Sequence, residues 1–403
     1  MQAAQPFERS IAPILDRAVS GRRLTREDGY MLMRAPAEEV PHLLQTASAL
    51  RDQGHGRVVT FSAKVFVPLT TLCRDYCGYC TFRRDPGEPG AHTMELEEVV
   101  SLCTAGERLG VKEALFSLGD RPEALFAEHG EWLSARGHTT TLGYLRDACA
   151  RVLEKTSLLP HPNAGLMGER DLRALREVSA SMGLMLENVS ERLLEPGECH
   201  DNAPDKVPRR RLAMIDAAGA LKIPFTTGIL IGIGETLEER VDSLLAIRDL
   251  DDRHGHIQEV IIQNFRAKPT IRMRDAPDPS FDDLEKTLAV ARVLLGPRAN
   301  LQAPPNLSPA TYPRLLSAGL NDWGGISPLT KDHINPEAPW PELTGLRNAT
   351  RAAGHELRER LSVYPEYIVD RPGFIDDEIR RRLEGFAGPD GLVRPELEPW
   401  RVS

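Results

Sequence analysis

Short apolar runs alternate with longer stretches of helical periodicity through most of the chain. Eight of the runs have the length and composition of buried strands, and they cover residues 65–69, 114–118, 158–160, 183–186, 225–231, 260–263, 300–303 and 321–323. Apolar strands separated by helices are typical of a parallel sheet that is covered by helices. Eight such units predict an α/β fold with a (β/α)8 TIM-type barrel, complete or partial.

The two ends of the chain depart from this alternation. Apolar residues recur at helical spacing within residues 11–19 and 43–50, and Thr25 and Asp28 have the spacing of a capping box. The C-terminal part is polar and is interrupted by proline and glycine. We therefore expect three parts: an N-terminal helical extension over 1–58, the barrel over 59–340, and a C-terminal helical extension and tail over 341–403.

Charge and hydropathy argue against nucleic acid and membranes as partners. The 403 residues carry 50 Lys and Arg against 59 Asp and Glu, a net charge of −9, and basic tracts are short, as at 209–211. We therefore expect no nucleic-acid surface. The chain has no run of about 18 apolar residues and no signal-peptide pattern, so we expect no membrane association and a reducing cytoplasmic location.

Three of the six cysteines, Cys73, Cys77 and Cys80, have the spacing C-x3-C-x2-C. Thiolates are soft ligands that suit zinc or an iron–sulfur cluster. A structural zinc needs a fourth ligand, and within this stretch Asp75 would be an unusual one. A [4Fe-4S] cluster held by three cysteines instead leaves one iron open. A non-catalytic metal site, or plain buried thiols, remains the alternative. The scattered Cys103, Cys149 and Cys199 are expected to be small buried hydrophobic residues.

Polar residues follow the expected strands, at the end of a barrel where chemistry is normally found. The candidates for contacts with a substrate are His161, Asn163, Glu187, Gln263, Asn264, Arg266, Asn306 and Asp322. Each of them is equally well explained as a structural polar group that has its own hydrogen-bond partners. No residue is assigned a catalytic role.

The cysteine spacing, with the aromatic Tyr79 before the last cysteine, resembles the signature of the radical S-adenosylmethionine (SAM) superfamily. The resemblance implies a radical SAM barrel, a [4Fe-4S] cluster on the three cysteines, SAM on the open iron and an external electron donor. It also implies a set of residues that contact the cofactor: Tyr79, Gly119, Asp120, Arg211, Gly232, Gly234 and Glu235.

Three matches carry this set. Gly119 and Asp120 lie where the superfamily binds the amino group of SAM, and residues 228–236 resemble its glycine-rich strand beside the adenosine. Arg211 precedes that strand at a spacing like that of an arginine that binds the SAM carboxylate. Each match has a plain alternative: a common turn, a strand-to-helix turn with Thr236 as N-cap, and a solvated arginine.

Longer motifs make the resemblance more specific. The segments 64–68, 116–123, 181–187, 204–206, 223–228, 263–268, 302–307 and 322–328 are similar to the cyclising subunit of the 7,8-didemethyl-8-hydroxy-5-deazariboflavin (FO) synthase family. The match runs from about residue 61 to about residue 340. Other radical SAM enzymes, of the menaquinone-pathway or biotin-synthase-like group, share the glycine strand and remain an alternative.

This resemblance implies a carbon–nitrogen lyase of coenzyme F-420 biosynthesis. Its small-molecule substrate would be a ribityl-aminouracil joined to a tyrosine-derived hydroxybenzyl group. The enzyme would close the third ring of this adduct and release ammonia, while a tyrosine-using partner subunit makes the adduct. Because the chain has a single cysteine triplet, it would be the cyclising half of a fused enzyme or a stand-alone subunit.

Overall fold

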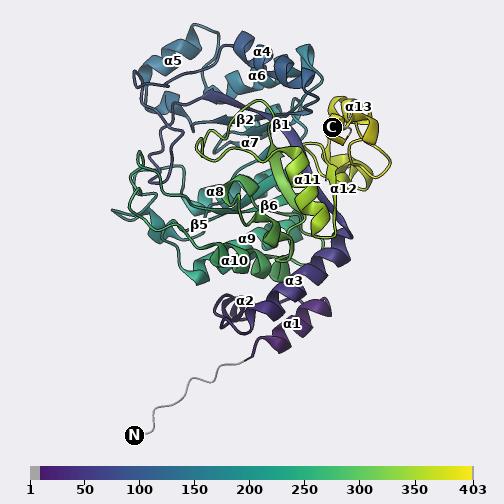
Figure 1. The fold of residues 1–403 in the computed structure, drawn as a ribbon. Coiled ribbons are helices and arrows are strands. Elements are labelled where there is room, and N and C mark those ends of the chain that lie inside the picture. The colour runs from purple at the N-terminus through teal and green to yellow at the C-terminus, as the bar shows by residue number, and fades with distance from the viewer. Residues whose placement is uncertain (1–9, 402–403) are drawn as a thin grey trace.

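The computed structural model describes residues 10–401, and its centre is a parallel barrel that is nearly closed (Figure 1). The strands are β1 (Val58–Thr70), β2 (Glu113–Leu118), β3 (Leu159–Asn163), β4 (Met182–Gly183), β5 (Phe225–Ile231), β6 (Ile257–Asn264), β7 (Leu301–Gln302) and β8 (Asp322–Ile326). Their spatial order is β3-β2-β1-β8-β7-β6-β5-β4. In the described residues no ladder joins β3 to β4, although Ala180 N–H donates to Pro160 O over 3.1 Å. The predicted (β/α)8 barrel is therefore confirmed in its partial form.

The strands differ in length from the sequence expectation at two places. β1 begins at Val58, well before the predicted start, because its first residues pair with a strand from the C-terminal part of the chain. β4 is short because the chain leaves the ladder after Gly183 and returns as a single bridge between Glu187 and Ile229.

Helices cover the outside of the barrel. They are α4 (Leu96–Arg108), α5 (Ala127–Ser134), α6 (Thr141–Lys155), α7 (Glu169–Arg176), α8 (Pro208–Ala220), α9 (Leu237–His254) and α10 (Phe281–Leu295). Thr236 caps α9 as predicted, accepting from Glu239 N–H while the Glu239 carboxylate accepts from Thr236 N–H. No helix within residues 10–401 is long and apolar enough to cross a membrane.

The first three helices pack against the outer helices of the barrel. They are α1 (Ala12–Val19), α2 (Arg26–Met33) and α3 (Val40–His55), and they lie beside α9 and α10 (Figure 1). The predicted capping box at Thr25 and Asp28 is present. Tyr30 Oη donates to Asp242 of α9 over 2.9 Å, which ties α2 to the barrel.

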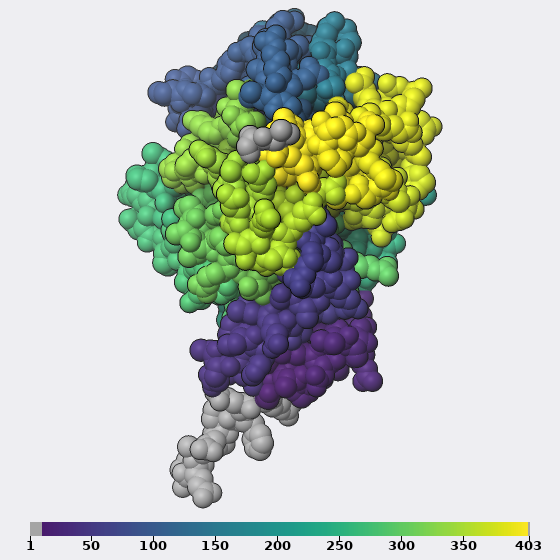
Figure 2. All heavy atoms as spheres, turned by 45° about the vertical axis from the view of Figure 1, so that its right-hand side comes forward, coloured from purple at the N-terminus to yellow at the C-terminus, as the bar shows by residue number. Residues whose placement is uncertain are grey.

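The C-terminal part contains helices and also a strand that the sequence did not reveal. Its elements are α11 (Leu343–Ala352), β9 (Glu356–Glu359), α12 (Pro365–Val369) and α13 (Asp377–Glu384). β9 pairs in parallel with the start of β1, from Val58 opposite Glu356 to Phe61 opposite Glu359. In Figure 2 this segment covers a flank of the molecule between the region of α4–α6 and the N-terminal helices.

The chain directly after β9 enters the N-terminal end of the barrel. Arg360 is buried there, with Nε 2.6 Å from Asp322 Oδ2 and Nη2 3.1 Å from Glu259 Oε1. Ser181 Oγ and Gln258 Nε2 both donate to the Ser362 carbonyl. The C-terminal segment thus closes the barrel from the side opposite to the cysteine loop.

Candidate active site

Two adjoining cavities occupy the barrel. The cysteine cavity, of about 250 Å³, lies at the carboxyl ends of the strands and is lined by Cys73, Cys77 and Cys80. The barrel cavity, of about 180 Å³, lies in the interior. Ser117, Asn163, Met185, Gln263 and Ile334 line both cavities. A group bound in one cavity therefore lies next to a group bound in the other.

The cysteine loop follows β1 and is held by backbone hydrogen bonds to distant segments. Arg74 N–H donates to Asp120 O over 3.1 Å, and Gly78 N–H donates to Cys199 O over 2.7 Å. Gly119 makes the close approach at the end of β2 possible, since a Cβ there would lie 1.9 Å from Leu72 O. The loop is therefore pre-shaped by the fold.

The three sulfur atoms are suited to a metal centre. Burial raises the pKa of the Cys73 thiol to about 12 and also raises the pKa of Cys77, so a bare thiolate is disfavoured and needs positive charge beside it. The N–H groups of Asp75 and Asp120 donate to Cys73 Sγ over 3.4 and 3.1 Å. Three soft ligands on one wall, with open volume in front of them, fit a [4Fe-4S] cluster that keeps one iron free.

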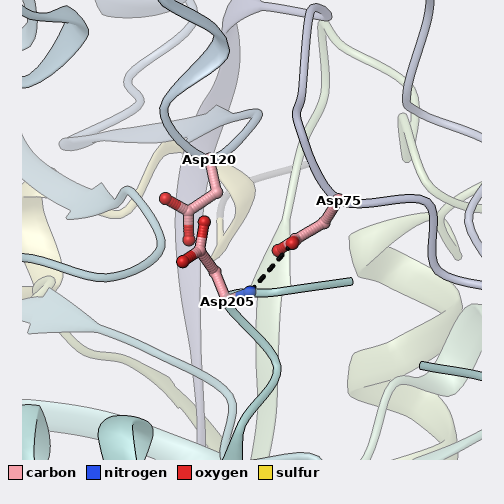
Figure 3. A group of neighbouring side chains, drawn as sticks. All are labelled: Asp75, Asp120 and Asp205. Atoms are coloured by element: carbon pink, nitrogen blue, oxygen red, sulfur yellow. Dashed lines mark hydrogen bonds between the residues drawn. The ribbon is translucent and has the colours of Figure 1, made fainter. Parts of the chain in front are cut away.

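Buried carboxylates lie beside the cysteines. Oxygens of Asp75, Asp120 and Asp205 lie within 4.8 Å of one another, and Asp75 Oδ1 accepts from Asp205 N–H over 3.0 Å (Figure 3). Three arginines surround the Asp205 carboxylate: Arg74, Arg121 and Arg210. Burial raises the pKa of Asp120 to about 6, and the Asp205 carboxylate acts in the same direction. Asp75 and Asp120 line the cysteine cavity, whereas Asp205 does not.

Cationic groups lie in the same cavity. Lys206 Nζ is 2.7 Å from Glu187 Oε1, and it lies 5.9 Å from the centre of the Tyr79 ring. Arg211 is buried and donates through Nε to Met185 O and through Nη1 to Asp205 O, over 2.8 and 3.1 Å. A guanidinium has five N–H groups, so these bonds leave donors for a ligand. Acidic and cationic groups together complement the zwitterionic, sulfonium-bearing end of SAM.

The structure brings four of the seven predicted cofactor residues to this cavity: Tyr79, Gly119, Asp120 and Arg211. Gly232, Gly234 and Glu235 do not line it. Glu235 accepts from Gly232 N–H and Ile233 N–H, each over 2.8 Å, and from Arg240 Nε over 2.7 Å. These bonds fix the turn after β5, in which Gly232 has φ +89°. The contact of Gly232, Gly234 and Glu235 with SAM stays a prediction. Leu230 is the residue of β5 that reaches the cavity.

Half of the predicted substrate residues line the cavities. His161, Asn163 and Gln263 face the barrel cavity, and Glu187 faces the cysteine cavity.

The other four have different surroundings. Asp322 pairs with Arg360, and Arg266 lies at the surface with Nη1 3.3 Å from Asp278 Oδ2. Asn306 donates to Asp332 Oδ2 over 3.0 Å, and Asn264 is buried outside both linings. Their contact with a substrate stays a prediction.

Sequence reasoning missed most of the barrel interior. Lys64 and Glu113 form a buried ion pair of 2.8 Å, and Glu259 and Arg360 also line the cavity. The available signal for Lys64 was its position directly before the apolar run 65–69. The loop over 327–340 adds Asp332, His333, Asn335 and Trp340, which no strand pattern marks.

Comparisons with known proteins agree with this geometry. Residues 67–247 match the family model described as the radical SAM superfamily. Among solved structures, HydG, a maturase of the [FeFe]-hydrogenase, superposes with TM-score 0.72 at 17% identity, covering 88% of this chain and 77% of that chain. Methylornithine synthase superposes with TM-score 0.66 at 20% identity, covering 85% and 97%. These two likenesses show the fold, while membership of the superfamily means that the chain uses a [4Fe-4S] cluster and SAM.

Curated relatives are much more similar in sequence. An FO synthase of Streptomyces coelicolor is 48% identical over 98% of this chain, which covers 47% of that protein. The chain thus spans about half the length of the curated FO synthases that it matches. A 7,8-didemethyl-8-hydroxy-5-deazariboflavin synthase of Methanopyrus kandleri is 49% identical over 84% of this chain, which covers 100% of that protein. The chain therefore belongs to the 7,8-didemethyl-8-hydroxy-5-deazariboflavin (FO) synthase family of radical SAM enzymes.

Proposed function

We propose that this chain catalyses the ring-closing half of deazaflavin formation. Its substrate is the adduct of a tyrosine-derived hydroxybenzyl group with a ribityl-aminouracil, and its products are the deazaflavin and ammonia. The observation that carries the proposal is the continuity of the two cavities at Ser117, Asn163 and Gln263. A cofactor at the cysteines thereby adjoins a polar interior that suits a pyrimidine and a sugar chain.

The residues of the cysteine cavity have distinct tasks. Cys73, Cys77 and Cys80 would hold the cluster, Lys206 and Arg211 would bind the carboxylate of SAM, and Asp120 would bind its ammonium group. When bound, the cluster and SAM supply one-electron chemistry that removes a hydrogen atom from the substrate. Lys206 is paired with Glu187 at 2.7 Å, so the Glu187 carboxylate is compensated by a cation within the same cavity.

The loop over 327–340 excludes water from the reacting centre. Thr81 Oγ1 donates to Ile334 O, and Lys268 Nζ donates to Asn335 Oδ1 over 2.8 Å. Trp340 stacks on Phe66 with ring centres 5.0 Å apart, and both line the barrel cavity. The loop is thus fastened at both sides of the barrel mouth, over the place where radical chemistry must be shielded.

Two partners follow from this role. A tyrosine-using partner subunit supplies the adduct, and an external donor supplies the electron. Cys77 and Cys80 also line a third hollow, an open groove of about 750 Å³, together with Arg83 and Arg272. We propose that the electron donor docks in this groove, next to the cluster ligands. We further propose that residues 59–340 carry the chemistry, with 1–58 and 341–403 as extensions, in a reducing cytoplasmic location.

The test is a reconstituted reaction under anaerobic conditions. Reduced protein with SAM receives either the purified adduct or tyrosine with ribityl-aminouracil. We expect fluorescent deazaflavin from the adduct alone, together with 5′-deoxyadenosine, methionine and ammonia. Deazaflavin from tyrosine without a partner would refute the division of labour, and no product from the adduct would refute the activity.

A further inference from the structure

The inner end of the barrel cavity is polar and closed. We call it the barrel floor and define it by Lys64, Glu113, His161, Gln302 and Ser362, all of which line the cavity. The first three come from β1, β2 and β3, and Lys64 lies directly opposite Glu113 in the ladder. Ser362 comes from the C-terminal segment, which closes the barrel from below. A ligand group that reaches this floor is remote from the cysteines.

A chain of hydrogen bonds fixes the proton on His161. Ser181 Oγ donates to the Ser362 carbonyl over 2.6 Å, and a carbonyl can only accept. The single hydroxyl proton of Ser181 is thereby used. His161 Nδ1, 2.7 Å from the same oxygen, must therefore be the donor in that contact. A neutral imidazole with its proton on Nδ1 has a bare acceptor at Nε2.

The surroundings keep this imidazole neutral. Burial lowers the pKa of His161 to about 4; the Lys64 and Arg360 cations act in the same direction, and the Glu113 carboxylate opposes them. No protein group within residues 10–401 makes a hydrogen bond to Nε2. His161 therefore presents an acceptor that only a ligand or water can satisfy.

Two more polar atoms of the floor are without a protein partner in the described residues. Gln302 Oε1 and Ser362 Oγ are buried and make no hydrogen bond there. Lys64 Nζ uses one of its three N–H groups on Glu113 Oε1, over 2.8 Å. The floor thus offers two pure acceptors, one cationic donor and one hydroxyl that can act either way. Buried polar atoms left without partners cost free energy, so this arrangement is suited to a polar ligand.

We infer that the barrel floor is a polyol subsite that binds the ribityl chain of the substrate, with His161 Nε2 and Gln302 Oε1 as acceptors of its hydroxyl protons. Each hydroxyl of a ribityl chain both donates and accepts, which matches a floor that has acceptors beside donors. This inference rests on the proposed function. It also sets the substrate's direction, because the ring system then lies toward Phe66, Trp340 and the junction with the cysteine cavity.

Ligand binding tests the inference without turnover. The reconstituted protein is titrated with the fluorescent ribityl deazaflavin and with an analogue that carries a pentyl chain without hydroxyls. We expect the wild-type protein to bind the ribityl compound at least tenfold more tightly. Ser362→Ala keeps the backbone carbonyl that accepts from Ser181, and Gln302→Met keeps the side-chain length. Each variant should lower the affinity for the ribityl compound about fivefold and leave the affinity for the pentyl compound unchanged. His161→Phe should act in the same way.

Ser179→Ala is the matched control, because Ser179 Oγ is buried and donates to Leu175 O outside the cavity. It should change neither affinity. Equal losses for both ligands in the floor variants would mean a structural role and overturn the inference. Equal binding of both ligands by the wild type would overturn it and leave the proposed function standing, whereas no binding of either would overturn both.

A spectrum of histidine-labelled protein gives a second readout. Two-bond ¹H–¹⁵N correlations distinguish the two neutral tautomers, and the signal of His161 is the one that His161→Phe removes. We expect the Nδ1–H form. The Nε2–H form would contradict the hydrogen-bond chain through Ser181 and overturn the role of His161 as an acceptor.

Discussion

The backbone N–H of Asp120 lies 3.1 Å from the sulfur of Cys73, so the end of β2 is hydrogen-bonded directly to the cysteine loop that follows β1. The N–H of Asp75 lies 3.4 Å from the same sulfur. Such bonds stabilise negative charge on a ligating sulfur and tune the potential of an iron–sulfur cluster. The geometry at the end of β2 therefore governs the position and the hydrogen bonding of the Cys73 sulfur.

Gly119→Ala should lower cluster content while the protein stays folded. The added Cβ would lie 1.9 Å from Leu72 O and 2.5 Å from the Cys73 Cβ, so the loop must move away from β2. We expect a severalfold loss of iron after anaerobic reconstitution, measured by iron analysis and by absorbance of the cluster. Gly130→Ala in α5 is the control, because a Cβ there meets nothing within 4 Å. Wild-type iron content in Gly119→Ala would contradict the close fit.

Cys77→Ala should prevent the protein from binding a near-stoichiometric amount of cluster iron and from cleaving SAM. Within residues 10–401, the cavity lining has no fourth cysteine that could replace the lost ligand. Cys103→Ala is the matched control: Cys103 is a buried thiol on α4 that lines neither cavity. Its loss should cost about 1 kcal/mol of stability and no iron. A full complement of cluster iron in Cys77→Ala would disprove the ligand assignment.

The barrel and the cysteine loop were predictable because they leave local patterns. A short continuous apolar run such as 225–231 predicts a strand that is buried on both sides of the sheet. The structure has β5 over the same residues. The cysteines lie close in the sequence, so their convergence needs no knowledge of the fold. Asn163 and Gln263 were found because they end strands.

Other parts of the site depend on long-range contacts that a single sequence does not mark. β9 is four residues long and amphipathic patterning cannot distinguish it from a turn, yet it pairs with β1 and brings Ser362 to the barrel floor. Asp322 was expected among the site residues at the strand ends, but it begins β8 and its carboxylate pairs with the distant Arg360. Glu235 likewise lies in a glycine-rich motif and is used to fix the turn.

Glu359 should make stability depend on pH. Burial raises its pKa to about 7 and Glu398 acts in the same direction, while the ammonium of Lys112, 2.9 Å away, acts against them. The folded protein holds this proton more tightly than the unfolded chain, whose pKa is near 4.5. The contribution is therefore fully present below pH 4.5 and is lost as the pH rises to about 7, a decline of about 3 kcal/mol.

Glu359→Gln should lack that decline. The measurement is urea unfolding of the wild type and the variant at several pH values between 4.5 and 7.5. Glu356→Gln, at an exposed position of the same strand, is the control and should follow the wild type. Parallel curves for the wild type and Glu359→Gln would show that Glu359 is ionised throughout.

The ion pair of Lys206 and Glu187 permits stability and cofactor binding to be separated. Both side chains are largely buried in the cysteine cavity, with Nζ 2.7 Å from Oε1. Lys206→Met leaves the Glu187 carboxylate without its cation and should cost about 3 kcal/mol of unfolding free energy. It should also weaken the binding of SAM, because the cation that we propose for the SAM carboxylate is removed.

The double variant Lys206→Met with Glu187→Gln decides between the two effects. Glutamine is neutral and close in shape to glutamate, so the buried uncompensated charge disappears and most of the lost stability should return. The cation, however, is still missing. We therefore expect SAM affinity to stay at least tenfold below wild type in an anaerobic titration, with cluster iron unchanged. If SAM affinity recovered together with stability, Lys206 would act only by compensating Glu187, and the carboxylate of SAM would have to be held by Arg211 alone.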